Sequence, residues 1–480
     1  MDPLKIAIVD DKVEYAEKLR KELRRSTGIL DKFKINYQIW DSSYESLDAR
    51  DFVRTKPDVL LLNENVSNRC GFEICREIKK MSPFTSVILT SGTPAFRSYR
   101  QLRDALNQDD VPLDGIIDEG LTVTKKQRVL RSNLRKPLNL AVLGLGYLGV
   151  GFMQNFLEMP EVAKVNGFSE REKTPGEGIV DYDSVYKLLE VLDQGYGQND
   201  KLNLLNSLEE AVSNTDAVVI ATSAIHGSSL GKVAKTPHRM DLIDVEGDKI
   251  SRYCQLLHDV GYNGLVTIFT NPVGGNLTLG RKVGLECGQL TSSINIDEER
   301  LHTAAKAVLG NNFDGFFKKF YQIVGDHGDA HLAQLHGGYD DIQRFTADYR
   351  RVKDAINDVL LQARQMAPDS MKASSDTGMP YYKSQLHGSK MFAKLARFGF
   401  NGIDSAYCYA NIGDQKGYLA LPVKVDYYPE IRFYPDSEVI NDLDGSTIQG
   451  LEDRLKFQGL YVENFLRHRE KNERKNHASV

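Results

Sequence analysis

The segment IVGDHGDAHL, residues 323–332, sets His327 between Asp326 and Asp329 with glycines as spacers. An imidazole titrates near neutral pH, so a histidine flanked by carboxylates is a candidate for proton transfer. Aspartate and glycine at this spacing are equally typical of a surface turn. The segment alone does not separate the two interpretations, and other parts of the chain have to.

Three more polar residues occur at positions where chemistry is possible. Asn271 follows an apolar run in IFTNPVGG, where its side-chain amide could hydrogen-bond a reacting oxygen. Asp297 and Arg300 are three residues apart in INIDEERLHTA and would share one face of a helix. A guanidinium can grip a carboxylate through two parallel hydrogen bonds. An ordinary Asn-Pro turn and an ordinary helix-surface ion pair are the alternatives.

A glycine-rich turn, GLGYLG, places Gly144, Gly146 and Gly149 in the G-x-G-x-x-G spacing. The first glycine allows a tight turn, the second lets the backbone approach a pyrophosphate, and the third lets helix and strand pack closely. The turn follows the apolar run 138–143 and opens a helical pattern. This context predicts a dinucleotide site, with phosphates at the start of the helix.

The next predicted strand ends in Ser169, Glu170 and Arg171, which we expect to bind the cofactor's ribose. A small hydroxyl beside an arginine suits the 2′-phosphate of NADP. Glu170 turned inward would instead bind the ribose hydroxyls and select NAD. The cofactor is therefore expected to be NAD or NADP, and the residues favour NADP.

The elements that position these residues follow an alternating pattern. Apolar runs at strand length alternate with amphipathic helical stretches, which predicts parallel sheets built from βαβ units. The pattern restarts at Pro137, and from about residue 296 helices and strands mix in an α+β lobe. The apolar runs are residues 5–11, 58–64, 86–92, 113–118, 138–143, 163–169, 217–224 and 265–273.

The first 120 or so residues resemble a response-regulator receiver domain, through IVDD with Asp10 and Asp11, PDVLLLNENV, and VILTSG with Thr90. In that family the third strand ends in the aspartate that accepts phosphate, and the fifth ends in a lysine. Here these positions carry Asn63 and Asp118. A neutral amide is not a nucleophile towards phosphorus. The resemblance therefore implies a pseudo-receiver that serves dimerisation or docking to a protein partner.

The rest of the chain, about residues 138–465, resembles the lactate/malate dehydrogenase family. The resemblance rests on the glycine-rich turn followed by TNPV, D-x-x-R and HGD, in that order and at intervals similar to the family's. Each motif is weak alone, and their combination is far more specific.

The resemblance implies a role for each polar residue. His327 would exchange the alcohol proton, and Asp297 would orient its ring and stabilise the protonated form. Arg300 would hold the substrate carboxylate, and Asn271 would hydrogen-bond the reacting oxygen. Arg239 would polarise the carbonyl group as hydride arrives. A solvated cation at the start of a helix is the alternative for Arg239.

One loop departs from the family. The segment 224–239, AIHGSSLGKVAKTPHR, is several residues longer than the loop that selects the substrate side chain in the family. Lys232, Lys235 and His238 could supply a second cation for a dicarboxylate or could be solvated charges. The segment 376–390 also lacks a clear counterpart. The sequence therefore leaves open which 2-hydroxy acid is the substrate.

We predict an α/β protein in which a flavodoxin-like receiver precedes a Rossmann dinucleotide-binding domain. A C-terminal α+β substrate domain of the lactate/malate dehydrogenase type would follow. The predicted divisions are a pseudo-receiver at 1–125, a linker at 126–137, an NAD(P)-binding domain at 138–295, a substrate domain at 296–466 and a flexible tail at 467–480.

The expected function is an NAD(P)-dependent 2-hydroxyacid dehydrogenase of the malate or lactate type, acting on a small 2-oxo or 2-hydroxy acid. A catalytically silent NAD(P)-binding sensor is the main alternative. A family 4 glycosidase also carries an Asn-Pro turn, but that reading leaves D-x-x-R and HGD unexplained. We expect a homo-oligomer, with the receiver-like domain available to a protein partner.

Composition bounds the remaining classes. The 480 residues are 41% hydrophobic and 26% charged, which is typical of a soluble globular protein. A net charge of −5 argues against nucleic acid or an anionic membrane as the main partner. Five scattered cysteines and the lack of a signal-peptide pattern indicate reduced thiols in the cytoplasm. The spacing of the cysteines predicts no metal site.

Overall fold

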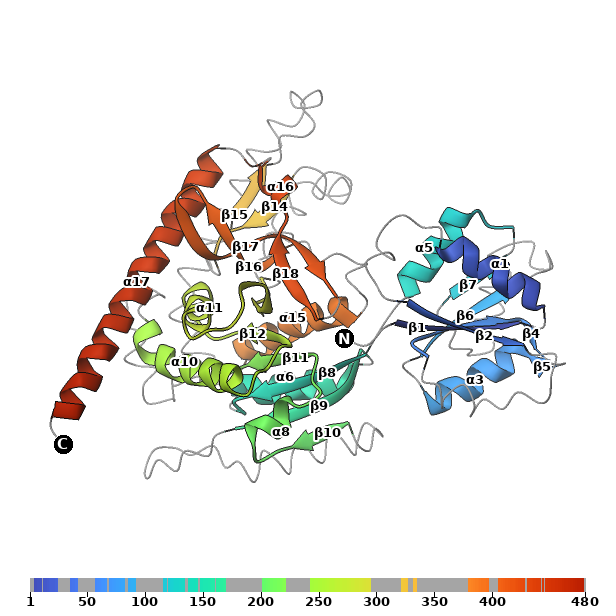
Figure 1. Ribbon diagram of the computed structural model, residues 1–480, viewed down its shortest axis with the longest axis horizontal. Coiled ribbons are helices and arrows are strands. Elements are labelled where there is room, and N and C mark those ends of the chain that lie inside the picture. The colour runs from blue at the N-terminus through green and yellow to red at the C-terminus, as the bar shows by residue number, and fades with distance from the viewer. Residues whose placement is uncertain are drawn as a thin grey trace.

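The structure, a computed structural model, describes more than half of the chain (Figure 1). The described residues are 4–10, 12–24, 35–41, 57–66, 69–82, 85–91, 115–118, 120–133, 137–145, 147–159, 161–169, 201–221, 242–294, 321–326, 331–334, 379–396, 405–427, 430–441, 443 and 445–478.

The N-terminal unit is built on a five-stranded parallel sheet. Numbered along the chain, its strands lie in the order 2-1-3-4-5, which is the flavodoxin-like doubly wound order. The expected parallel α/β architecture is thus confirmed here, while the receiver assignment stays a prediction. The strands across the sheet are β2 (Ile35–Asp41), β1 (Leu4–Asp10), β3 (Val59–Asn63), β6 (Ser86–Ser91) and β7 (Gly115–Asp118).

Helices cover both faces of this sheet (Figure 1). Side chains alternate along a strand, so Ile6 and Ile8 pack with α1, and Ala7 and Val9 pack with α3. A third helix, α5, lies beside α1, where Lys126 pairs with Glu22 at 2.9 Å. The helices are α1 (Val13–Arg24), α3 (Gly71–Met81) and α5 (Val123–Asn133), and a small hairpin joins β4 (Asn65–Val66) to β5 (Arg69–Cys70).

One predicted division falls inside an element. The linker expected at 126–137 begins within α5, which packs against α1 and β7. Three residues at helical spacing anchor this helix to the N-terminal unit: the buried Lys126 and Leu130 and the partly buried Val129. The segment KKQRVLRSNLRK, residues 125–136, is strongly basic, so its sequence does not indicate a buried face. A lysine can nevertheless be buried there, because its aliphatic stem can lie along an apolar surface.

The second unit is a six-stranded parallel sheet. Numbered along the chain, its strands lie in the order 3-2-1-4-5-6, which is the Rossmann order. This confirms the expected Rossmann-type sheet. The strands across it are β10 (Leu202–Leu204), β9 (Val162–Phe168), β8 (Leu138–Leu143), β11 (Ala217–Ile220), β12 (Leu265–Ile268) and β13 (Leu290–Thr291).

Aromatic side chains pack the helix α15 (Met379–Ala396) against α6 (Tyr147–Glu158), the first helix of this unit. Phe156 meets Phe392 edge to face at 5.2 Å, and Phe152 meets Phe269 at 4.7 Å between ring centroids. Gly388 lies directly against Phe152 and leaves no room for a side chain. The helices of this unit are α6 (Tyr147–Glu158), α8 (Leu208–Val212), α10 (Ile243–Asp259), α11 (Val273–Lys282), the short η3 (Cys287–Gln289) and α15 (Met379–Ala396).

The C-terminal part combines antiparallel strands with helices, as the sequence predicts. A three-stranded sheet meets the edge of the Rossmann sheet through an isolated antiparallel bridge between Ala406 and Ser293, which lies two residues after β13. A two-stranded ribbon joins it through Gly325 and Ala420. The strands are β14 (Tyr321–Val324), β15 (His331–Gln334), β16 (Ser405–Ile412), β17 (Gln415–Asp426) and β18 (Arg432–Pro435), followed by α16 (Ser437–Asn441).

The chain ends in a long helix, α17 (Gly445–Ala478), which runs along one edge of the molecule (Figure 1). Leu451, Leu455, Val462 and Phe465 recur at helical spacing and are buried against the C-terminal sheet and its neighbours. The segment 467–480, expected to be a flexible tail, instead continues this helix to Ala478. Its Arg, Lys and Glu residues are good helix formers, which the count of apolar residues alone overlooked.

Candidate functional site

The carboxyl ends of β8, β9 and β11 form the switch point of the Rossmann sheet, where the chain connections change direction. Gly144 directly follows β8, Ser169 follows β9 and Ala221 follows β11. Ligands of open α/β sheets bind in the crevice at this point. The glycine-rich turn and the expected ribose-binding Ser169 therefore meet at one edge of the sheet, as the sequence predicts.

The glycines of this turn have physical reasons to be glycines. Gly144 has a φ of 91°, and its N–H donates to the carbonyl of Phe168 at 2.9 Å. A Cβ on Gly149 would overlap the carbonyl oxygen of Gly144 and lie 2.9 Å from its carbonyl carbon. The start of α6 is thereby pressed against the end of β8. This cradle fits a pyrophosphate at the helix N-terminus. Gly146 lies outside the described residues.

Replacing Gly149 by alanine is expected to destabilise the protein by about 1–3 kcal/mol and to weaken cofactor binding about tenfold or more. The added methyl group meets backbone atoms of Gly144, which cannot swing aside as a flexible side chain would. Thermal unfolding and a reduced-cofactor fluorescence titration measure the two effects.

The matched control is Gly450→Ala, also within a helix, where an added Cβ has no atom within 4 Å. It should leave cofactor affinity unchanged and raise stability by up to about 1 kcal/mol. Equal behaviour of the two variants would contradict the close approach at Gly149.

The residues expected to discriminate NAD from NADP are only partly described. Ser169 is buried with 9% of its surface exposed, at the end of β9. Glu170 and Arg171 lie outside the described residues. Ser169 thus lies at the expected end of β9, while its ribose-binding role and the choice of cofactor stay predictions.

Asn271 lies in a firmly built turn between β12 and α11. It is half-buried and precedes a cis peptide bond to Pro272. The buried side-chain amide of Asn276 donates to the carbonyl of Thr270 at 2.9 Å. The backbone N–H of Asn276 donates to the carbonyl of Pro272 at 2.9 Å. Two hydrogen bonds across the turn thus fix the backbone around Asn271 at the carboxyl edge of the sheet.

The two residues before His327, Gly325 and Asp326, are held by hydrogen bonds to other elements. Gly325, with a φ of 120°, exchanges two hydrogen bonds of 2.9 Å with Ala420 on β17. Asp326 follows with 7% of its surface exposed. Its carboxylate accepts a hydrogen bond from the Tyr407 hydroxyl at 2.5 Å and another from the Gln458 amide at 2.9 Å.

Four of the residues with expected roles lie outside the described residues, so their roles stay predictions: Arg239, Asp297, Arg300 and His327. The described neighbours of two expected active-site segments do come together. Gln458 on α17 contacts Gly274, three residues after Asn271, and also contacts Asp326.

Neither Tyr407 nor Gln458 stands out as a motif in the sequence. The available signal for Gln458 is its position in α17, where it interrupts an inward apolar stripe that includes Leu455 and Val462. A polar residue at a core position of a helix needs a partner, because burying an unpaired amide is costly. Tyr407 on an apolar strand offers no comparable signal.

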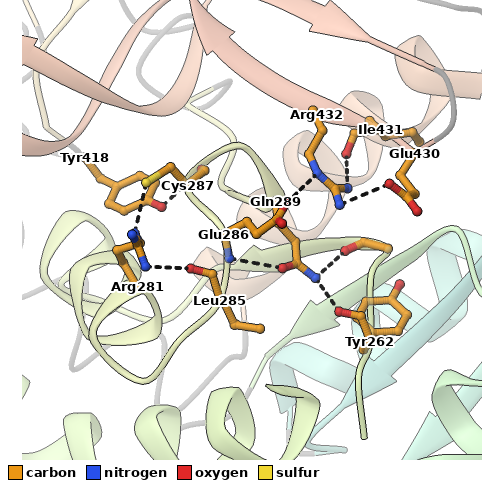
Figure 2. Close-up of polar contacts among 11 residues, drawn as sticks. Tyr262, Arg281, Leu285, Glu286, Cys287, Gln289, Tyr418, Glu430, Ile431 and Arg432 are labelled. Atoms are coloured by element: carbon orange, nitrogen blue, oxygen red, sulfur yellow. Dashed lines mark hydrogen bonds and ion pairs between the residues drawn. The ribbon is translucent and has the colours of Figure 1, made fainter. Parts of the chain in front are cut away.

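Polar contacts also join the edge of the Rossmann sheet to the C-terminal sheet (Figure 2). The amide of Gln289 donates to the carbonyls of Tyr262 at 2.7 Å and Gly264 at 2.9 Å. Arg432 on β18 lies 3.5 Å from Glu286 and 3.3 Å from Glu430 between charged atoms. The Gln289 bonds lie within the Rossmann unit and hold the residue before β13, whereas the Arg432–Glu286 pair connects this edge to β18 of the C-terminal sheet.

The same junction holds a cysteine–arginine contact (Figure 2). Arg281 donates from Nε to the sulfur of Cys287 at 3.0 Å, and the Tyr418 hydroxyl donates to the Cys287 carbonyl at 3.1 Å. Burial raises the pKa of Tyr418 well above its ordinary value, so its hydroxyl stays a donor at physiological pH. Through Cys287, this cluster ties α11 to β17.

The N-terminal unit gathers its polar residues in a similar way, at the carboxyl edge of its own sheet. Asp10 ends β1, Asn63 ends β3 and Asp118 ends β7. Asn63 lies in register with Thr90 of β6, and Asp10 and Thr90 are each 1% exposed. The positions of Asp10, Asn63, Thr90 and Asp118 thus agree with those that the sequence predicts.

Within the described part of the chain, no group of three or more histidine, cysteine or acidic side chains is placed to hold a metal ion. No helix among those residues has the length and apolar character needed to cross a membrane.

No protein-family model matches this sequence. A search of curated proteins also finds no match. Sequence similarity therefore leaves the family of the chain unassigned.

Solved structures do share its fold. Malate dehydrogenase from Cryptosporidium parvum matches with 14% identity and a TM-score of 0.50, covering 69% of this chain and 99% of that one. Malate dehydrogenase from Plasmodium falciparum matches with 13% identity and a TM-score of 0.50, covering 68% and 98%. Lactate dehydrogenase from Cryptosporidium parvum, complexed with lactic acid and nicotinamide adenine dinucleotide, has 16% identity and a TM-score of 0.48, covering 69% and 98%.

Identities this low show the fold alone. About two thirds of this chain has the fold of the malate dehydrogenases. The Rossmann-type α/β fold expected for the part of the chain after the N-terminal unit is therefore confirmed.

Proposed function

We propose that this protein is an NAD(P)-dependent 2-hydroxyacid dehydrogenase of the malate or lactate type. The observation that carries the proposal is the glycine cradle of Gly144 and Gly149, at the switch point of a sheet with Rossmann order. The shared fold supports it, as does the arrangement of the Asn271 turn and the Asp326 segment around Gln458.

The bound nicotinamide would supply or accept a hydride at C2 of the substrate. For reduction, His327 gives its proton to the carbonyl oxygen, and Asp297 stabilises the charged ring before the transfer. Arg300 holds the substrate carboxylate, while Asn271 and Arg239 hydrogen-bond the oxygen on which negative charge develops. The reverse reaction returns the alcohol proton to His327. These roles follow the family resemblance residue by residue.

The N-terminal unit is proposed to be a pseudo-receiver that serves regulation, homo-oligomer assembly or docking to a protein partner. Asn63 stands at the end of β3, where the family's phosphate-accepting aspartate is expected. An amide cannot form the acyl phosphate, so any signal would have to reach this unit by another route. That substitution also favours the second candidate function, an NAD(P)-binding sensor without catalysis.

A cofactor titration followed by a substrate panel separates the two candidates. Reduced cofactor is titrated into the purified full chain by fluorescence, and a panel of 2-oxo acids that differ in side-chain charge and size is then added. The dehydrogenase proposal expects binding and oxidation with at least one 2-oxo acid. Tight binding without oxidation by any of them favours the sensor, and no binding contradicts both.

We propose NADP as the preferred cofactor, because Ser169 and Arg171 suit a 2′-phosphate. Arg171→Ala is expected to reduce NADPH affinity about tenfold or more and to change NADH affinity little, since only NADPH carries that phosphate. Fluorescence titration with both cofactors measures this.

Arg467→Ala, which removes an exposed arginine on α17, is the control and should change neither affinity. Equal losses for the two cofactors in Arg171→Ala would sink the NADP preference. A strong preference of the wild type for NADH would do the same and point to Glu170 as the ribose ligand.

A further inference from the structure

The carboxylate of Asp326 is held by two side chains that are themselves deeply buried. The Tyr407 hydroxyl donates to one oxygen at 2.5 Å and the Gln458 amide to the other at 2.9 Å. Tyr407 has 0% and Gln458 has 1% of its surface exposed. Because each oxygen has its own donor, rotation of the carboxylate would break a hydrogen bond at a residue that is only 7% exposed.

The two donors come from elements that are fixed independently. The Tyr407 N–H donates to the carbonyl of Ser292 at 3.0 Å, and the Tyr407 carbonyl accepts from the Thr291 hydroxyl at 2.6 Å. This ties β16 to the last strand of the Rossmann sheet. Gln458 stands on α17 between the buried Leu455 and Val462. Asp326 is therefore bound to the frame of the molecule from two directions.

Gln458 also contacts the other expected active-site segment. A Cβ on Gly274 would overlap the Gln458 amide nitrogen and lie 2.9 Å from its Cδ. Gly274 is in the first turn of α11, three residues after Asn271. A single side chain of α17 thus links the turn that carries Asn271 to the residue that precedes His327.

We propose that Tyr407 and Gln458 are positioning residues, which place His327 by holding the carboxylate of its neighbour Asp326. The proposal rests on the proposed dehydrogenase function. One peptide unit separates the fixed Asp326 from His327, so the clamp limits where the imidazole can lie. Proton transfer requires donor and acceptor within hydrogen-bond reach, and a misplacement of about 1 Å can lower a rate about 100-fold.

Two substitutions test the clamp from its two sides. Tyr407→Phe removes only the hydroxyl, and Gln458→Glu replaces the donating amide by a carboxyl group that must compete with Asp326 for a proton, because two carboxyl groups this close cannot both be ionised. Tyr409→Phe on the same strand and Gln449→Glu on the same helix are the matched controls. Gln449 is exposed and contacts only its own helix, through Asp453 at 3.2 Å, among the contacts of the described residues.

Three measurements accompany each variant of the full chain. They are the single-turnover oxidation rate of bound reduced cofactor, the affinity for that cofactor, and the NMR signal of the His327 ring, assigned by its loss in His327→Asn. We expect the clamp variants to turn over about 10–100-fold more slowly with unchanged cofactor affinity and a displaced His327 signal. The control variants should match the wild type.

A double substitution separates positioning from a merely structural role. In the His327→Asn background, Gln458→Glu should lower the residual rate no further, because the residue it positions is already gone. A further loss of the same size would contradict the proposal. An unmoved His327 signal with wild-type rates in both clamp variants would also overturn it.

Failure of the proposed function is a separate result. If none of the 2-oxo acids leads to oxidation of the cofactor by the wild type, the proposed function is wrong. The His327 signal then still tests the clamp. A signal displaced in both clamp variants then supports the clamp, and an unmoved signal overturns it.

Discussion

Replacing His327 by asparagine is expected to abolish hydride transfer while sparing folding and cofactor binding. Asparagine keeps a polar edge of similar size but carries no proton at neutral pH. General acid–base catalysis contributes about 10²–10⁴-fold to a rate, and the loss should reach at least that scale. The expectation is motivated by HGD, which follows TNPV and D-x-x-R in the order of the family.

Single-turnover oxidation of bound reduced cofactor by the best 2-oxo acid measures the effect. His258→Asn is the matched control, because His258 is half-exposed at the end of α10, beside Asp259 at 3.4 Å. It makes the same chemical change next to a carboxylate, away from the switch point, and should leave the rate unchanged. Near-equal rates for wild type and His327→Asn would mean that His327 is an ordinary turn residue without a catalytic role.

Arg300→Lys should leave cofactor binding intact and sharply reduce kcat/KM for every 2-oxo acid. A point ammonium cannot reproduce two parallel hydrogen bonds from a guanidinium to the substrate carboxylate. A lost charge-assisted pair costs about 1.5–3 kcal/mol, which corresponds to roughly 10–150-fold in kcat/KM. Steady-state kinetics over the substrate panel measures it.

The control represents the alternative interpretation of Asp297 and Arg300 as a helix-surface ion pair. Arg20 and Glu17 form such an i,i+3 pair on α1 at 2.6 Å. Arg20→Lys should therefore change kcat/KM little, since surface pairs contribute about 0–1 kcal/mol. An Arg300→Lys variant with unchanged kcat/KM for all active substrates would mean that Arg300 does not bind the carboxylate.

The sequence predicted those parts of the fold that rest on local pattern. Strands β8, β9, β11 and β12 are largely apolar runs bounded by turn residues, and apart from the exposed Lys164 at the start of β9 most of their residues are buried, which makes them recognisable in the sequence. The edge strands β10 and β13 are only 3 and 2 residues long, and no pattern of that length identifies a strand. They are defined by pairing with β9 and β12, which is a tertiary interaction.

The candidate site divides in the same way. The tight turn at Gly144 and the close approach of helix and strand at Gly149 depend on local backbone geometry, so the glycine spacing in the sequence predicts them. The clamp on Asp326 joins residues 81 and 132 positions away, and only the folded chain brings them together. The continuation of α17 over 467–478 was not predicted, because helix formation there depends on propensity rather than on an apolar stripe.

Transfer of deuterium tests the central claim most directly. The full chain is mixed with reduced cofactor that carries deuterium at C4 of the nicotinamide, in turn on each face of the ring, together with the panel of 2-oxo acids. Mass spectrometry then follows the label. The account predicts a 2-hydroxy acid with one deuterium at C2, formed from one of the two labelled cofactors and in amounts equal to the cofactor oxidised. Bound cofactor that delivers no deuterium to any 2-oxo acid from either face would contradict it.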